Sequence, residues 1–568
     1  MAKRAYTMRL RSSLALAALL AALLPAGARS AEAPDCSGTR LGNRTDTATG
    51  VADPDGDMRV FAIQYRQDLA YVESYESFRL KMECLLLDYV VANRSPTLPN
   101  VVVLNEDIGL ATLGVGTRGL GARTIATLPV KNPQNLAGAI AALGSVGAGY
   151  AAQVAYYALK EPQTGAQRLI LAGATDTFVR AFMQTFSDLA RKYDVYIVAS
   201  NNQPEFREVR VADEPAAAAL IDPDLLPRYL DGELSTVYEV VDDAGPGLPD
   251  ADAGAGAAGM NVYNKAFMWS PYDGVEPYAA ERFSRFALDE HMTTADPRSN
   301  LVATVKKTPV TTIERDLLDI TDDGDMSVEN TGPFPLASAA PLAEPPLPAA
   351  ARIGFGISLP SFKWGNAFGQ PFSGDGCASP DTWMRCLDQR GMTVFLQPEA
   401  NPGCCWVDYI DAGWAPPAWQ ALSWMDSAWR AVADPSVQNI RYAITPHMVG
   451  NLVDLAFDGQ SVIFERCVPA GAGDTCDGNA AQAFVGARTV VACPQELDRC
   501  DDSRLAPYAG LKRETIVMAP WVLADDPALS PIDNRERLAA RGHEMLAGSR
   551  SPFENGYLET AIWADLPL

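Results

Sequence analysis

Histidine is the scarcest of the side chains that commonly carry chemistry. Only His291, His447 and His543 occur among 568 residues, and none is spaced as a ligand beside a cysteine pair. A structural zinc site of the cysteine–histidine type is therefore excluded. A glycine string at residues 144–149 lacks the preceding strand that a nucleotide-binding loop needs. We therefore expect no metal and no cofactor.

Positive charge is the second shortage. Lysine and arginine total 46 residues against 70 of aspartate and glutamate, which gives a formal net charge of −24. No basic patch offsets this balance, and an acidic surface repels a phosphate backbone. Nucleic acid is therefore not expected as a partner, and the acidic balance is interpreted as a solubility feature.

Long apolar runs are absent after the first 28 residues, so no later segment is expected to span a membrane. At the start, four cations precede the short apolar run SLALAALLAALLPAG and a small-residue exit at residues 26–28. This order is typical of a secretory signal peptide, with an uncleaved anchor as the alternative. Cleavage after Ala28 (or Ser30) predicts a secreted or periplasmic protein, and removal of residues 1–28 takes the net charge from −24 to −28.

Ten cysteines follow this segment, and an even number in an exported chain favours disulfides. Connectivity is not fixed by sequence; the simplest pairs are Cys36 with Cys84, Cys467 with Cys476, and Cys493 with Cys500. The composition, 48% hydrophobic and 20% charged, is that of a globular protein with a sizeable core.

Composition shifts suggest the domain organisation. We expect a signal peptide at residues 1–28, a leader at 29–56, one large domain at 57–465 and a cysteine-containing extension at 466–568. Two segments rich in proline, glycine and alanine, at about 242–259 and 333–350, read as insertions in the large domain. Alternating strand and helix patterns favour the α/β class.

Three apolar segments far apart in the chain each run into a polar residue. They are NVVVLNE, ending at Glu106; NLVATVKK, ending at Lys306 and Lys307; and ARIGFGIS, ending at Ser358. A buried strand that ends in a polar group presents that group at a sheet edge, where open sheets bind ligands.

Glutamate, lysine and a nucleophile in this order resemble the carbon–nitrogen hydrolase (nitrilase) superfamily, in which the third residue is a cysteine rather than a serine. Further matches cover roughly residues 57–465: FSDLARKYDVYIVASNNQ, VYNKAFMWSPYDG, VKKTPVTTIER, RYAITPHMVGN and FDGQS. On this resemblance Lys307 is the family lysine, with Lys306 as the alternative, and Glu314 is the second glutamate.

The resemblance implies a four-layered α-β-β-α sandwich, which often dimerises through its outer helices, here with a disulfide-rich C-terminal extension. It also implies the roles of the site residues: Glu106 is the general base, Lys307 stabilises the oxyanion, Glu314 is a second carboxylate and Ser358 holds the nucleophile's place. The implied ligand is a small non-peptide amide or nitrile, which is hydrolysed or whose acyl group is transferred.

Serine leaves the activity open, because its hydroxyl is less acidic than a thiol and serine hydrolases normally supply a histidine base. The first interpretation is an active hydrolase that uses Ser358 or a nearby thiol such as Cys377. The second is an inactive family member, a pseudoenzyme that binds a ligand or partner. A third, an α/β-hydrolase, follows from residues 356–360, where proline replaces the last glycine of G-x-S-x-G. An active enzyme requires Glu106 and Lys307 to converge on Ser358.

Overall fold

The structure is a computed structural model. It describes residues 34–127, 137–241, 260–272, 297–334, 347–400, 420–453, 455–457, 460–467, 514–520 and 558–568. Residues 1–38 and 39–568 form two units, and the fold below is that of the second. The expected signal peptide and the insertion at 242–259 lie outside the described residues.

The larger sheet has seven strands in the order β1-β17-β2-β4-β5-β8-β9. Its strands are β1 (Thr49–Val51), β17 (Thr560–Leu566), β2 (Met58–Gln64), β4 (Asn100–Val103), β5 (Tyr196–Gln203), β8 (Tyr263–Trp269) and β9 (Leu301–Lys306). Strands β2, β4 and β5 are parallel. Strand β8 is antiparallel to both β5 and β9, so β9 runs in the same direction as β4. The carboxyl ends of β4 and β9 therefore lie at the same edge of the sheet.

The second sheet has five strands in the order β10-β11-β12-β15-β16. They are β10 (Ile353–Phe355), β11 (Val394–Leu396), β12 (Tyr442–Thr445), β15 (Val462–Glu465) and β16 (Thr515–Met518), of which the first three are parallel. Two small sheets join β14 (Leu455–Phe457), β13 (Val449–Leu452) and β3 (Arg66–Gln67), and β6 (Phe206–Arg210) with β7 (Thr236–Val240).

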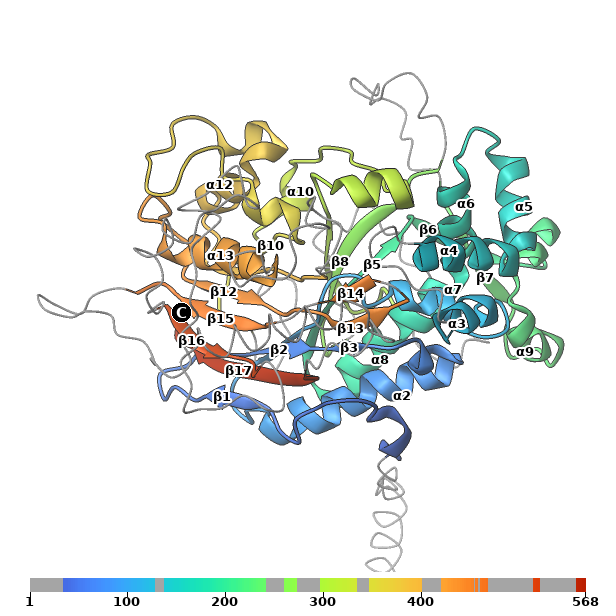
Figure 1. Ribbon diagram of the computed structural model, residues 1–568, viewed down its shortest axis with the longest axis horizontal. Helices are drawn as coiled ribbons and strands as arrows, with labels where there is room; N and C mark the ends of the chain where they lie inside the picture. Colours follow the sequence, from blue (N-terminus) through green and yellow to red (C-terminus); the bar gives the residue numbers. More distant parts are fainter. Residues whose placement is uncertain are drawn as a thin grey trace, which may run out of the picture. The chain divides into compact units, whose positions relative to one another are not determined.

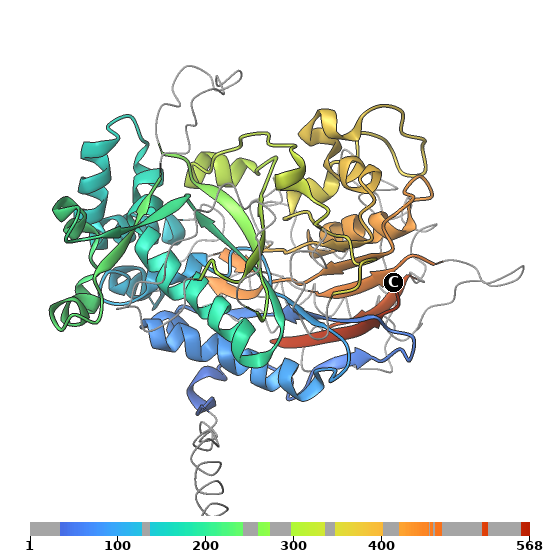
Figure 2. The same cartoon turned by 180° about the vertical axis from the view of Figure 1, so that it is seen from behind.

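Some helices of the described residues cover the two large sheets, and others pack on one another. They are α2 (Tyr75–Leu85), α3 (Leu120–Thr127), α4 (Ala137–Gly149), α5 (Ala151–Lys160), α6 (Ala166–Gly173), α7 (Thr175–Thr177), α8 (Gln184–Tyr193), α9 (Leu226–Leu230), α10 (Val328–Thr331), α12 (Trp383–Gln389) and α13 (Gln420–Ala433). A capping box at Ser74 and Ser77 begins α2, and Asp194 in the left-handed conformation ends α8. Figure 1 shows α12 and α13 beside the five-stranded sheet and α2 and α8 beside the seven-stranded sheet; Figure 2 shows the same arrangement from behind.

Alternation along β2 divides the interior into two cores. Met58, Val60 and Ala62 join a buried cluster with residues of the five-stranded sheet, α12 and α13. Phe61 and Ile63, on the opposite face, join a second cluster with α2, α8 and the residues before α8. Because side chains of a strand alternate between faces, one apolar strand can serve both cores.

Two described segments after residue 465 form strands of the large sheets. Strand β16 lies in the five-stranded sheet, and β17 lies inside the seven-stranded sheet between β1 and β2. All seven residues of β17 pair with β2 in antiparallel register. The described parts of residues 466–568 thus belong to the large unit. Local composition gave no sign of this pairing, which joins segments at opposite ends of the chain.

Cys377 is bonded to Cys386, with a sulfur–sulfur distance of 2.02 Å. The suggestion that Cys377 could act as a nucleophilic thiol is therefore wrong, because a disulfide sulfur is not a free thiolate. Cys36, Cys84 and Cys467 are also disulfide-bonded. The remaining cysteines, Cys404, Cys405, Cys476, Cys493 and Cys500, lie outside the described residues.

Within the described ranges, no single helix has the length and apolar character needed to cross a membrane. Helices α4 and α5 meet these criteria only as a pair, and the pair is bent by 79° at residue 150.

Candidate active site at the strand ends

Three of the four predicted site residues meet at one edge of the seven-stranded sheet. Glu106 follows β4 and Lys307 follows β9, whose carboxyl ends share that edge. Glu314 begins the short π-helix Glu314–Leu318 seven residues after Lys307. All three side chains are buried, with exposed fractions of 2%, 2% and 4%. The fold thus brings together the glutamate, the lysine and the second glutamate of the resemblance.

Lys307 bridges the two glutamates. Its Nζ lies 2.6 Å from Oε1 of Glu106 and 2.7 Å from Oε2 of Glu314. Asn264, on β8, reinforces the bridge, because its Nδ2 donates to Glu106 at 2.8 Å and to Glu314 at 2.6 Å. Lys306, the alternative lysine, instead contacts Asp323 at 3.3 Å. Lys307 is therefore the lysine that faces Glu106.

The three ionisable groups of this cluster differ in the direction and cause of their pKa shifts. Burial raises the pKa of Glu106 above its ordinary value in spite of Lys307, and the nearby Glu314 adds to the effect. Burial also opposes ionisation of Glu314, but Lys307, Asn264 and the backbone of Thr311 outweigh it and lower that pKa. Burial works against the charge of Lys307 as well, yet the two carboxylates raise its pKa. The lysine stays cationic, and Glu106 has the greater basicity of the two glutamates.

Ser358 is not part of this cluster and lies at the end of a strand of the five-stranded sheet. It follows β10 and precedes the 3-10 helix Leu359–Phe362, and its backbone has φ 55° and ψ −109°. This conformation is strained for a residue other than glycine, and such strain occurs at nucleophile turns between a strand and a helix. The residues after β10 pack closely on β11. This packing requires glycine at position 356, since a Cβ there would lie 2.7 Å from the ring of Phe395 on β11.

The Ser358 hydroxyl contacts neither Glu106 nor Lys307 among the interactions of the described residues. Its Oγ accepts a hydrogen bond from Nε1 of Trp424 at 2.9 Å. The convergence on Ser358 that an active glutamate–lysine–serine site requires is thus incomplete. The two sheets do meet here, because Oε2 of Glu106 accepts from the backbone N–H of Ala400 at 3.2 Å.

Glu399, which sequence analysis missed, interacts with both Glu106 and Ser358. It follows β11 and is fully buried. Burial and the charge of Glu106 raise its pKa well above the ordinary value, although the Ser358 hydroxyl favours the ionised form. Its Oε1 accepts from Gln397 at 2.6 Å, while its Oε2 has no hydrogen-bond donor of good geometry within the described residues. Glu399 is therefore the carboxyl group beside Ser358.

His447 is the second residue that the fold brings unexpectedly to the site. Its backbone forms a parallel bridge with Glu399 at the end of β12. Burial lowers the pKa of its imidazole to about 3, and neither ring nitrogen has a hydrogen-bond partner within the part of the chain that is described. A serine charge relay requires histidine between serine and acid. Here the glutamate is the group beside the serine, which argues against the α/β-hydrolase interpretation.

The sequence carried a signal for Glu399. The segment VFLQPE is an apolar strand that ends in a polar residue, the same pattern that identified Glu106, Lys307 and Ser358. Trp424 had only a general signal, the density of tryptophans between residues 406 and 429, and three of the five tryptophans there lie outside the described residues.

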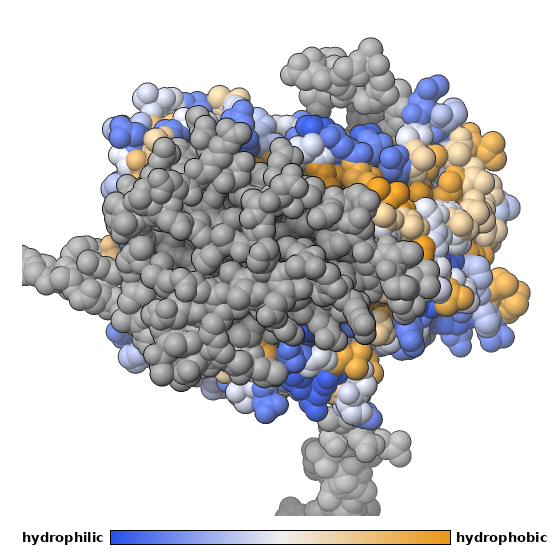
Figure 3. All heavy atoms as spheres, in the orientation of Figure 1, coloured by the Kyte–Doolittle hydropathy of each residue, from blue (hydrophilic) through white to orange (hydrophobic). Residues whose placement is uncertain are grey.

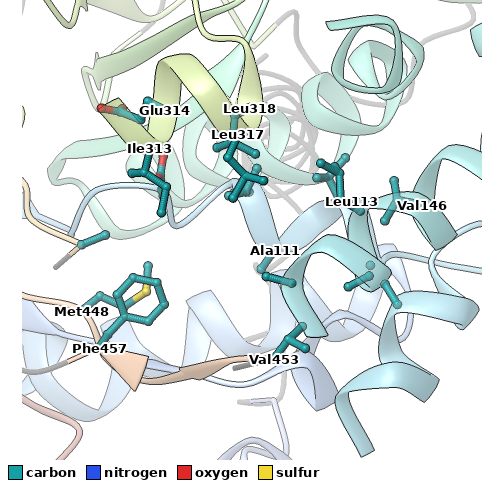
Figure 4. Close-up of a pocket in the computed structure, with 18 of the residues that line it drawn as sticks. Ala111, Leu113, Val146, Ile313, Glu314, Leu317, Leu318, Met448, Val453 and Phe457 are labelled. Carbon is teal, nitrogen blue, oxygen red and sulfur yellow. The ribbon is translucent and has the colours of Figure 1, made fainter. Parts of the chain in front are cut away.

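A cavity of about 140 Å³ adjoins the cluster. Glu106, Asp107, Lys307 and Glu314 supply its polar wall, and Ser358 does not line it. The apolar wall comprises Leu69, Leu110, Ala111, Leu113, Ala122, Ala139, Ala142, Leu143, Val146, Ile313, Leu317, Leu318, Ala400, Met448, Val453 and Phe457. Figure 4 shows Ile313 and Leu317 facing Met448 and Phe457, with Glu314 towards one end and Val146 towards the other.

No family model matches the chain, and no curated protein matches it in sequence. Solved structures of the Nesterenkonia sp. AN1 amidase, from the nitrilase superfamily, are similar. One, a cysteine-to-serine mutant, has 12% identity and a TM-score of 0.29 over 72% of this chain and 85% of that one. Another, with the acetamide moiety of fluoroacetamide on its active-site cysteine, has 10% identity and a TM-score of 0.32 over 74% and 86%.

Proposed function

We propose that this chain is an exported carbon–nitrogen hydrolase-like protein, which hydrolyses a small non-peptide amide or nitrile or transfers its acyl group. The observation that carries the proposal is the buried cluster of Glu106, Lys307 and Glu314 at the ends of two strands. A buried ion network with a raised carboxylate pKa beside a cavity is typical of acid–base chemistry. The proposed fold is a four-layered α-β-β-α sandwich, supported by the two cores on either face of β2.

In the proposed reaction, Oγ of Ser358 attacks the carbonyl carbon while its proton passes to the carboxylate of Glu399. The developing oxyanion is stabilised by Lys307, whose ammonium has three N–H donors, two of them directed at Glu106 and Glu314. The leaving amine takes the proton from Glu399 as the tetrahedral intermediate collapses to an ester. Water then attacks this ester with Glu106 as general base, which releases the acid and restores Ser358.

A second candidate function is ligand binding without turnover. The observation that favours it is the position of Ser358, which is held by Trp424 and is absent from the cavity wall. In this alternative, the pocket retains the ligand-recognition groups, while Glu399 and Trp424 keep the serine away from the bound carbonyl carbon.

Intact mass spectrometry of the oxidised full-length protein, exposed to simple amides, nitriles and activated esters, separates the two functions. We expect an acyl adduct that peptide mapping places on Ser358. It should be lost in Ser358→Ala and strongly reduced in Glu399→Gln and Lys307→Gln. Lys306→Gln is the matched control, because Lys306 pairs with Asp323 and should not affect acylation.

An adduct only in Ser358→Cys would mean that the other catalytic groups are functional but do not activate the serine hydroxyl. No adduct in either protein would support the binding function and overturn the hydrolase proposal. An adduct that maps to another residue would exclude Ser358 as the nucleophile.

A further inference from the structure

The cavity beside the carboxylate–lysine cluster is amphiphilic. Its lining is apolar except for the groups at the cluster end, where Glu314 and Lys307 lie. Much of the apolar lining comes from α3, α4 and the π-helix Glu314–Leu318. A ligand that fits must therefore have an apolar part of limited size and a polar group at one end.

The volume limits the apolar part. A cavity of about 140 Å³ is close in size to the engineered apolar cavity of roughly 150 Å³ in another protein, which stays dry and binds benzene. An apolar group of about six carbon atoms therefore fits this space. Such a cavity gains affinity from each methylene that it removes from water.

The polar end favours a neutral head group. Glu106, Asp107, Glu314 and Glu399 surround a single lysine, and burial with mutual repulsion already raises the pKa of Glu106, Asp107 and Glu399. An anionic head group would add to this repulsion. An amide instead offers a carbonyl oxygen to Lys307 and N–H donors to the carboxyl oxygens of Glu106 and Glu314, which line the cavity.

We propose that the ligand of this site is a neutral amide with an apolar acyl group of about six carbon atoms, whose acyl group lies in the cavity and whose amide contacts Lys307. This inference rests on the proposed function for the identity of the head group. The acyl-chain preference depends on the cavity alone, so binding tests it independently of turnover.

Isothermal titration of full-length Ser358→Ala with acetamide, butanamide, hexanamide and octanamide tests the inference without hydrolysis. Affinity should rise about fourfold per added methylene up to hexanamide, and then level off or fall. Hexanoate should bind more weakly than hexanamide. A series without chain-length dependence, or hexanoate binding as well as hexanamide, would overturn the proposal.

Ala142→Leu places three carbon atoms in the cavity from the buried face of α4. It should lower the affinity for hexanamide about tenfold or more, because the added atoms occupy the space of two or three methylenes. Acetamide affinity should change little. Ala141→Leu, on the exposed face of the same helix, is the matched control and should behave like the parent.

Leu317→Ser provides a second variant, since it removes apolar lining without overpacking and its side chain is only half-buried. It should also weaken hexanamide selectively. If neither variant changes the affinity for hexanamide, the ligand does not occupy this cavity. Chain-length-dependent binding without any turnover by the wild-type protein would refute the hydrolase function and leave the ligand class standing. Turnover without chain-length dependence would refute the proposed ligand class and leave the hydrolase function standing.

Discussion

The least ordinary single residue is Glu399, a fully buried carboxyl group beside a serine. Burial and the neighbouring Glu106 make its ionisation costly, so its pKa is raised in the folded protein. Because burial disfavours the ionised form of this base, acylation of Ser358 should become faster as the pH rises. The same property makes Glu399 a determinant of stability.

Replacing Glu399 with glutamine should change how stability depends on pH. Above its ordinary pKa of 4.5, Glu399 ionises more readily in the unfolded chain than in the folded protein, where its pKa is raised. Its contribution to stability is thus fully present below that pH and falls by about 1.4 kcal/mol per pH unit until the raised pKa is passed. Glutamine cannot ionise, so Glu399→Gln should gain stability relative to wild type as the pH rises.

Urea denaturation at several values between pH 4 and pH 9 measures this difference. Glu76→Gln, at an exposed position on α2, is the control for the substitution itself. A constant difference between wild type and Glu399→Gln across the range would show that Glu399 is as easily ionised in the folded protein as in the unfolded chain.

At the scale of elements, the segment that leads into β17 is tied to helix α2 by a buried ion pair. Lys81, on α2, lies 2.6 Å from Glu559, and both side chains are 2% exposed. Lys81 also donates to the backbone oxygen of Thr39 at 3.0 Å. Such a pair fixes the register of two elements, since removing one partner leaves an uncompensated buried charge.

Lys81→Met should destabilise the protein by about 3–5 kcal/mol, because Glu559 would remain buried without its cation. The double variant Lys81→Met with Glu559→Leu should recover much of this loss, since no unpaired charge remains. Lys192→Met, whose half-exposed ammonium pairs with Glu83, is the control and should cost no more than about 1 kcal/mol. Denaturant unfolding measures all three, and equal losses in the single and double variants would contradict the argument.

At the scale of the whole molecule, the last strand of the chain, β17, is an internal strand of the larger sheet. Strand β17 lies between β1 and β2, and Arg59 on β2 pairs with Asp565 on β17 at 2.6 Å. Without β17, strand β2 would have an unpaired edge, and the apolar residues Ala561 and Ile562 would leave both cores.

Apolar side chains are exposed at Leu120 on α3 and Ile140 on α4, and Figure 3 shows hydrophobic residues among the helices of that region.

Deletion of residues 558–568 should therefore prevent cooperative folding, although it removes only the last strand. Far-UV circular dichroism, size-exclusion chromatography and thermal unfolding of the truncated chain test this outcome. Deletion of Leu568 alone is the control, because it removes only the terminal residue, whose backbone N–H contacts Asp57. A cooperative thermal transition in the chain that ends at residue 557 would show that β17 is dispensable.

Much of the local structure could be predicted from the sequence, because apolar runs bounded by polar residues form strands wherever they are buried. The apolar run MRVFAIQ forms β2, and YESFRLKMECL, with apolar residues at helical spacing, forms α2. The small-residue segment that contains the glycine string at 144–149 forms the bent pair α4 and α5. The candidate residues at strand ends followed from the same pattern, which VFLQPE before Glu399 also shows.

The sequence by itself determined which segments are strands and helices and which polar residues stand at their ends, since these depend on contacts within a few residues. Only the tertiary structure decided which ends meet. It placed Glu106, Lys307 and Glu314 in one cluster, set Glu399 beside Ser358 and inserted β17 between β1 and β2. These are pairings between residues tens to hundreds of positions apart, and burial of complementary faces selects them rather than any local preference.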